Sequence, residues 1–181
     1  MSKFKQLYKP LLDGARWLTP DSAAIDGTEF GHWLLEPDSL SRRLERHCEH
    51  FTVSLLEQVR ISRKRLADDE RALVGDIDCL LRKVVLKGDG VPWVYARTLI
   101  PLDTLTGQEQ DLEQLGEVPL GFRVFTDHSA RRDALVVAKV GSDINQLWAR
   151  RSRLWLNDKP LLVAELFLQD APIYKETQRW K

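Results

Sequence analysis

Arg82, Arg97 and Glu165 each interrupt a row of large apolar side chains, a setting in which a charge needs a partner. Because side chains two residues apart on a β-strand share a face, each charged residue can be grouped with its own row. The three rows are Leu80, Arg82, Val84 and Leu86; Trp93, Tyr95, Arg97 and Leu99; and Leu161, Val163, Glu165 and Phe167. Glu165 has no polar neighbour in the run LLVAELFL, so both faces of its strand are expected to be covered.

These three charges predict either a buried ion pair or a site for an anionic ligand. An unpaired charge in apolar surroundings costs several kcal/mol, so each must find a partner. One interpretation is a structural salt bridge between Glu165 and either Arg82 or Arg97. Two cations against one anion favour a ligand instead, and the planar fork of arginine suits a carboxylate. The spacing therefore predicts a small, partly apolar ligand that carries a carboxylate and faces Glu165.

Other chemistry-bearing residues give weaker signals. His47 and His50 form an HxxH pair, but the helix is expected to end between them and no third ligand is evident, so no metal site is predicted. Arg150, Arg151 and Arg153 are interpreted as a solvated basic strand edge. The sequence contains no glycine-rich phosphate loop, nucleophile elbow or CxxC motif.

The first elements that could position these residues are helical. Gly31–Cys48 is predicted to form two short helices around Pro37, with Asp38 or Ser39 as the cap of the second. Residues 51–55 then alternate between apolar and polar types, which predicts a half-buried strand.

Two β-hairpins are predicted in the rest of the chain. The first joins CLLRKVVL to VPWVYARTLI through a turn at residues 88–90, and the second joins RSRLWL to KPLLVAELFL through a turn at Asn157-Asp158. Residues 61–76 are rich in both charges and are expected to form a surface loop or a short exposed helix. Residues 142–148 are expected to form a short helix or an irregular connection. No βαβ alternation is present, so the pattern predicts the α+β class, with a single antiparallel sheet and helices packed on one face.

Length and composition indicate one ordinary domain that spans residues 1–181. Lys+Arg and Asp+Glu both number 27, and this balance argues against a nucleic-acid partner. No apolar run has the length of a signal-peptide core or a membrane span, so no membrane insertion is expected. Cys48 and Cys79 have no metal-type spacing and indicate a reducing compartment. The protein is therefore expected to be cytoplasmic.

Several segments, in order along the chain, carry a resemblance to one known family. They are WLLEPDSLSRRLE, the pair LRKVVL and GVPWVYARTLIP, LGEVPLGFRVF, and above all RRSRLWLNDKPLLVAELFL followed by APIY. Together they resemble the bacterial chorismate pyruvate-lyases. The resemblance is clearest over residues 33–174. The first thirty residues and residues 61–76 depart from it, and residues 175–181 are expected to form a tail.

The resemblance implies a fold and an activity. Members of this family cleave chorismate into 4-hydroxybenzoate and pyruvate for ubiquinone synthesis, as monomers, and without a metal or organic cofactor. The implied fold buries the product between an antiparallel sheet and two helical flaps. Chorismate and 4-hydroxybenzoate are the expected small-molecule partners.

The resemblance also assigns roles to residues of this chain. Arg82 matches the arginine that holds the product carboxylate, and the backbone amide of Leu120 matches a second donor to the same group. Glu165 matches the carboxylate that meets the ring hydroxyl, and which proton it transfers stays open. Leu40 stands where a flap residue contacts the ligand. Arg97 matches a second arginine near the pocket.

The resemblance leaves other functions to weigh. A sensor domain of a transcription regulator is similar in fold, but it normally follows a DNA-binding winged helix, for which this chain has no room. Chorismate mutases are usually helical, whereas hairpins dominate here. A lyase-like domain that binds an aromatic acid without cleaving it stays open, although Arg82 and Glu165 together favour catalysis.

Overall fold

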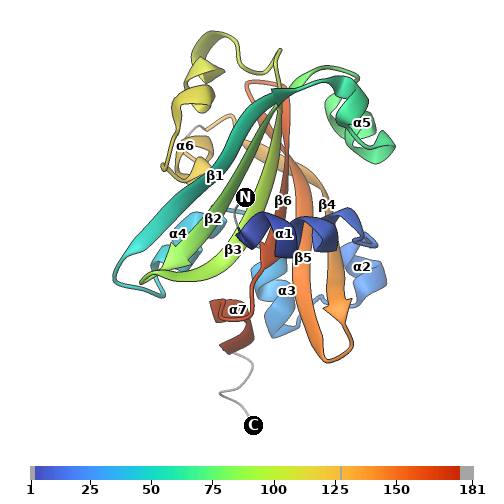
Figure 1. Cartoon of the computed structure of the whole chain (residues 1–181), viewed down its shortest axis with the longest axis vertical. Coiled ribbons are helices and arrows are strands. Elements are labelled where there is room, and N and C mark those ends of the chain that lie inside the picture. Colours follow the sequence, from blue (N-terminus) through green and yellow to red (C-terminus); the bar gives the residue numbers. More distant parts are fainter. Residues whose placement is uncertain (1–2, 127, 176–181) are drawn as a thin grey trace.

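The computed structural model describes residues 3–126 and 128–175 of the chain (Figure 1). Of the expected tail at residues 175–181, residues 176–181 therefore lie outside the described residues. The strands are β1 (Phe51–Ile61), β2 (Cys79–Gly88), β3 (Val91–Pro101), β4 (Arg131–Ser142), β5 (Asn145–Leu156) and β6 (Lys159–Phe167). The α-helices are α1 (Lys3–Asp13), α2 (Pro20–Ala23), α3 (Glu29–Leu34), α4 (Leu40–Glu45), α5 (Asp68–Val74), α6 (Leu120–Val124) and α7 (Pro172–Lys175). Two 3-10 helices, η1 (Arg63–Arg65) and η2 (Gly107–Gln114), complete the elements.

The six strands form one sheet in the order β1-β2-β3-β6-β5-β4, and all neighbouring pairs are antiparallel. This confirms the α+β class and both predicted hairpins. Each hairpin turns at residues that tolerate a positive φ. Asp89 and Gly90 have φ of 48° and 79°, and Asn157 and Asp158 have φ of 47° and 60°. Consecutive left-handed residues match the twist of paired strands, which explains why aspartate, glycine and asparagine stand there.

A third hairpin, β4–β5, was not predicted. Residues 142–148, expected to be a short helix or an irregular connection, instead close this hairpin, with Ser142 paired to Asn145 and Gly141 paired to Gln146. The expectation is wrong because Leu147, Trp148 and Ala149 are consecutive apolar residues. A strand covered on both faces shows such a run without the alternation that reveals a half-buried strand.

Helices cover both faces of the sheet, although the sequence predicted one. α3, α4, α6 and η2 pack on the face that carries Val84 and Leu154. α1 packs on the opposite face, which carries Val85 and Ala164, and Val74 of α5 packs there as well. Figure 1 shows α1 in front of the sheet and α3 and α4 behind it. The apolar residues on both sides of β2 are the physical reason, because each side must be covered.

The helices α3 and α4 are the two short helices expected around Pro37. The Thr28 hydroxyl accepts a hydrogen bond from the amide of Gly31 at 3.0 Å and caps α3. The Ser39 hydroxyl accepts one from the amide of Arg42 at 3.3 Å and caps α4, so Ser39 rather than Asp38 fills that position. Short helices of this kind depend on such caps and on packing.

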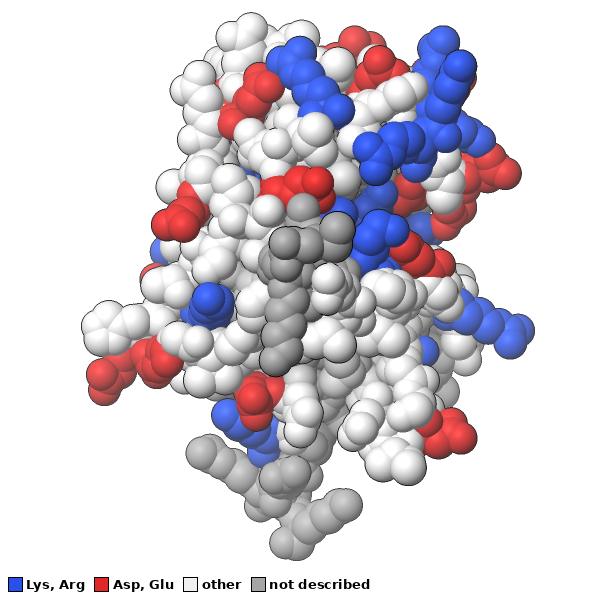
Figure 2. Space-filling view, in the orientation of Figure 1, with Lys and Arg blue, Asp and Glu red and all other residues white. Residues whose placement is uncertain are grey.

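The outer surface carries both charge signs. Figure 2 shows basic and acidic side chains intermixed on the side of the molecule that carries α1. The predicted loop or exposed helix at residues 61–76 contains α5, whose Val74 and Glu70 are buried. Within residues 3–126 and 128–175, no helix is long and apolar enough to cross a bilayer.

Candidate active site

A pocket lies between the sheet and the helices α4 and α6. Its floor is formed by side chains from β1, β2, β3, β6, β5 and β4, and its cover comes from α4, α6 and the residues just before α6. The lining residues are Leu40, Ser41, Val53, Arg82, Val84, Leu86, Ala96, Thr98, Pro119, Leu120, Gly121, Phe125, Arg132, Leu154, Val163 and Glu165. The pocket is mostly apolar, with charges confined to three residues.

Arg82 of β2 lines this pocket and is 2% exposed. Its guanidinium donates to the side-chain oxygen of Gln58 at 3.4 Å and to the carbonyl of Val118 at 3.1 Å. No carboxylate of the described residues forms an ion pair with it. Burial lowers the pKa of Arg82 from its usual value, but the group stays a cation at neutral pH. A buried cation with only neutral partners favours an anionic ligand.

The start of α6 lies beside Arg82. Val118, whose carbonyl accepts the hydrogen bond from Arg82, is two residues before Leu120, the first residue of the helix. The first amides of any helix have no carbonyl acceptor within that helix. The Leu120 amide and the Arg82 guanidinium can therefore serve the same anionic group, and the roles that the family resemblance implies for them stay predictions.

The helices α4 and α6 meet over the pocket at Gly121. A Cβ atom at this position would lie 2.6 Å from the hydroxyl oxygen of Ser39 and 3.3 Å from that of Ser41. Glycine is therefore what permits the two helices to approach so closely. The guanidinium of Arg42 also stacks on the ring of Phe122, 3.7 Å from its centre. The two helices form one cover, to which Leu40 contributes a buried apolar side chain over the pocket.

Glu165 of β6 lines the pocket and forms an ion pair with Arg150, the residue directly opposite it on β5. Neither Arg82 nor Arg97, the two partners predicted for Glu165, forms this ion pair. Arg150 is completely buried, and its second arm donates to the carbonyls of Leu34 and Glu36, at 3.3 Å each. Arg150 thus ties Glu165 to the end of α3.

The interpretation of Arg150, Arg151 and Arg153 as a solvated strand edge is wrong. β5 lies between β6 and β4, so it is an interior strand, and these arginines pair with Glu165, Asp69 and Asp133 respectively. The sequence did contain a signal. A two-residue turn at Asn157-Asp158 places Arg150 opposite Glu165 by simple counting along the hairpin.

Arg132 of β4 is a pocket residue that the sequence did not reveal. Its guanidinium donates to the hydroxyl of Ser152 on β5. Its Nε is buried and has no hydrogen-bond acceptor among the described residues. Burial, with a smaller effect from the charge of Arg150, lowers the pKa of Arg132 to about 10. A bulge in β4 between Asp133 and Val136 breaks the alternation that would have pointed to Arg132.

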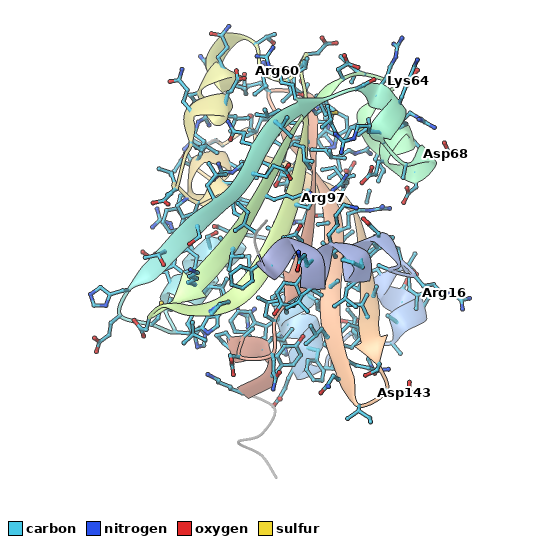
Figure 3. The ribbon with its side chains drawn as sticks, in the orientation of Figure 1. Arg16, Arg60, Lys64, Asp68, Arg97 and Asp143 are labelled. Carbon is cyan, nitrogen blue, oxygen red and sulfur yellow. The ribbon has the colours of Figure 1, made fainter. Side chains whose placement is uncertain are left out.

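Arg97 does not share this pocket. Alternate residues of β3 face opposite sides, and its neighbours Ala96 and Thr98 face the pocket. Arg97 therefore points to the other face, where it forms an ion pair with Glu70 of α5. Figure 3 shows Arg97 on the side of the sheet that carries α1. Its predicted position near the ligand is thus corrected.

Comparisons with known proteins connect this chain to a family. A family model described as "Chorismate lyase" matches residues 11–179. A protein of Photobacterium profundum named "Probable chorismate pyruvate-lyase" is 73% identical over 179 residues, which cover 99% of each chain. A protein of Erwinia tasmaniensis named "Chorismate pyruvate-lyase" is 45% identical and covers 91% of this chain and 92% of its own.

A likeness among solved structures concerns the fold alone. The ligand-binding domain of a putative GntR-family transcriptional regulator from Bordetella bronchiseptica matches with a TM-score of 0.51 at 16% sequence identity. The match covers 68% of this chain and 89% of that domain. Over this part of the chain, the fold is therefore similar to that of the ligand-binding domain.

The buried pair makes a prediction about stability. Arg150→Met should lower the free energy of unfolding by about 3–5 kcal/mol, because it leaves the Glu165 carboxylate buried without its partner. Urea unfolding measures this loss. Arg60→Met is the control, since Arg60 forms a surface pair with Glu113, and surface pairs contribute less than about 1 kcal/mol. Equal losses in the two variants would show that the buried pair has no special role.

Proposed function

Because the chain belongs to the chorismate lyase family, we propose that its pocket binds chorismate and cleaves it into 4-hydroxybenzoate and pyruvate. The protein is a carbon–oxygen lyase, and its aromatic product supplies ubiquinone synthesis.

The observation that carries the proposal is the placement of opposite charges across an apolar pocket. Arg82 on β2 and Glu165 on β6 are separated by β3, whose pocket-facing residues are the small Ala96 and Thr98. The product has a carboxylate and a hydroxyl at opposite ends of a flat ring. A ring above Ala96 would direct its carboxylate to Arg82 and the Leu120 amide, and its hydroxyl to Glu165.

The chemistry is an elimination that acid–base groups alone can perform. The bond between the ring and the ether oxygen breaks, and its electron pair leaves with enolpyruvate. The neighbouring ring carbon loses a proton, and the ring becomes aromatic. Of the charged residues that line the pocket, Glu165 is the one whose carboxylate can accept a proton, since the others are arginines. We assign it the ring proton, which it then passes to the departing enolpyruvate.

Binding in this pocket also contributes to catalysis by orienting the substrate. The sheet floor of the pocket and the cover of α4 and α6 hold the ring, so the reacting bond is oriented relative to Glu165.

The chain is proposed to act as a monomer, as the family resemblance implies. Cys48 and Cys79 are both free thiols, and free thiols are typical of the reducing cytoplasm, where we place the protein.

A second candidate function is binding without cleavage. The shared fold of the regulator domain favours it, because that fold also serves as a ligand-binding domain. Incubation of the purified protein with chorismate separates the two, since only the lyase releases 4-hydroxybenzoate, which absorbance detects.

Glu165→Gln should lower turnover by at least about a hundredfold, the usual scale for an acid–base group. Glutamine retains an oxygen that can accept from Arg150, so the fold should survive. Glu70→Gln is the matched control, because Glu70 is also a buried carboxylate paired with an arginine but lies on the other face. Steady-state release of 4-hydroxybenzoate measures both. Near-normal turnover in Glu165→Gln would make Glu165 structural.

Arg82→Lys should weaken the binding of 4-hydroxybenzoate by roughly 1–3 kcal/mol, because lysine keeps the charge and loses the two-pronged hydrogen bonding. Titration calorimetry gives the affinity. Arg97→Lys on the opposite face should leave it unchanged. If Arg97→Lys weakens binding and Arg82→Lys does not, the carboxylate site lies elsewhere than proposed.

Product release should limit turnover, because the cover of α4 and α6 must lift before a buried ring can leave. Rapid mixing should show a burst of 4-hydroxybenzoate followed by a slower steady rate, and added product should inhibit. Leu40→Ala should shrink the burst by removing apolar contact with the ring. Leu44→Ala is the control, since Leu44 is buried on the same helix but does not line the pocket. A linear trace from the first turnover would contradict this prediction.

A further inference from the structure

We propose that Arg132, positioned by Ser152, is a second carboxylate site that binds the enolpyruvyl carboxylate of chorismate and then the pyruvate formed from it. This inference rests on the proposed function and extends it. It assigns a binding residue to the enolpyruvyl half of the substrate, which Arg82, Leu120 and Glu165 are not proposed to contact.

The hydrogen bonding of Arg132 points to a missing anion. Its guanidinium donates to the hydroxyl of Ser152, which is 1% exposed. Its Nε is buried without an acceptor, and no carboxylate of the described residues forms an ion pair with it. Buried donors are almost always satisfied in folded proteins. An unsatisfied donor on a buried cation that lines a pocket is accounted for by a ligand carboxylate.

The position of Arg132 across the sheet matches the order of groups in chorismate. In the strand order, Glu165 on β6 lies two strands from Arg82 on β2 and two strands from Arg132 on β4. Neighbouring strands are about 4.8 Å apart. Chorismate has its ring carboxylate at one end, the bond that breaks in the middle and the enolpyruvyl carboxylate at the other end. The two arginines thus flank the proposed acid–base group as the two carboxylates flank the reacting bond.

The charges around the pocket also suit a dianion. Glu165 is already neutralised by Arg150, so the charges of Arg82 and Arg132 remain for the ligand. 4-Hydroxybenzoate carries one carboxylate and satisfies Arg82 alone. Chorismate carries two carboxylates and satisfies both arginines. With a pKa of about 10, Arg132 stays protonated at neutral pH.

Arg132 would act during the reaction as well as in binding. As the ring–oxygen bond breaks, negative charge grows on the ether oxygen of the departing enolpyruvate. A fixed cation on the carboxylate of that group stabilises the growing charge in a pocket whose lining is mostly apolar. The enolpyruvate becomes pyruvate when Glu165 delivers to it the proton taken from the ring, so no proton is gained or lost overall.

The test compares two ligands that differ in the enolpyruvyl group. In the slow Glu165→Gln protein, calorimetry measures the affinity for chorismate while little of it is cleaved. Adding Arg132→Gln should weaken chorismate binding about ten- to a hundredfold, the range for a hydrogen bond to a charged group. Binding of 4-hydroxybenzoate should change less than about twofold. Arg82→Lys, in contrast, should weaken both ligands.

Further measurements keep the inference open to refutation. Arg132→Lys, for use if Arg132→Gln fails to fold, should raise the KM for chorismate and leave the inhibition constant of 4-hydroxybenzoate unchanged. Pyruvate should compete with chorismate in the native protein and lose that effect in the Arg132 variants. Equal weakening of both ligands, or no change in either, would overturn the assignment of Arg132. Failure of the native protein to cleave chorismate would instead overturn the proposed function.

Discussion

The buried ion pair between Glu165 and Arg150 is the interaction on which the rest of the site depends. Burying two charges is costly, and this pair reduces the cost because Nε of Arg150 donates to Glu165 while Nη1 donates to the carbonyls at the end of α3. One arginine therefore holds three elements together: β5, β6 and the helix that leads into the cover. The same contact fixes the orientation of Glu165 toward the pocket, so stability and chemistry share one structural feature.

The sheet supplies the spacing of the site. Its charged residues stand on alternate strands, Arg82 on β2, Glu165 on β6 and Arg132 on β4, with small side chains between the first two. Strand spacing is nearly constant, so the distances between functional groups follow from the order of the strands. Apart from the proposed Leu120 amide donor, the cover contributes apolar contact. Gly121 and Ser39 let its two helices close against each other over an apolar ring.

The two faces of the sheet use charge differently. On the face away from the pocket, Arg97 pairs with Glu70 and Arg151 pairs with Asp69, so each cation has its own carboxylate and anchors α5. On the pocket face, Arg82 and Arg132 have no carboxylate of the described residues. Arginines on the far face thus stabilise the fold, because each is paired with a carboxylate of the protein. Arginines on the pocket face lack such a carboxylate and are therefore available to a ligand.

The sequence by itself determined the fold class, two hairpins, the short helices around Pro37, and the placement of Arg82 and Glu165 in apolar rows. These features depend on local turn residues and on side-chain periodicity, both of which the linear chain displays. Only the tertiary structure decided which face each row occupies and which strands are interior. It shows that Arg97 lies on the far face, that Arg150 is the buried partner of Glu165 and not a surface residue, and that Arg132 lines the pocket. Counting along the β5–β6 hairpin does place Arg150 opposite Glu165. That β5 is an interior strand and that Arg132 reaches the pocket depend instead on strand order and on a bulge in β4, which the predicted local patterns did not reveal.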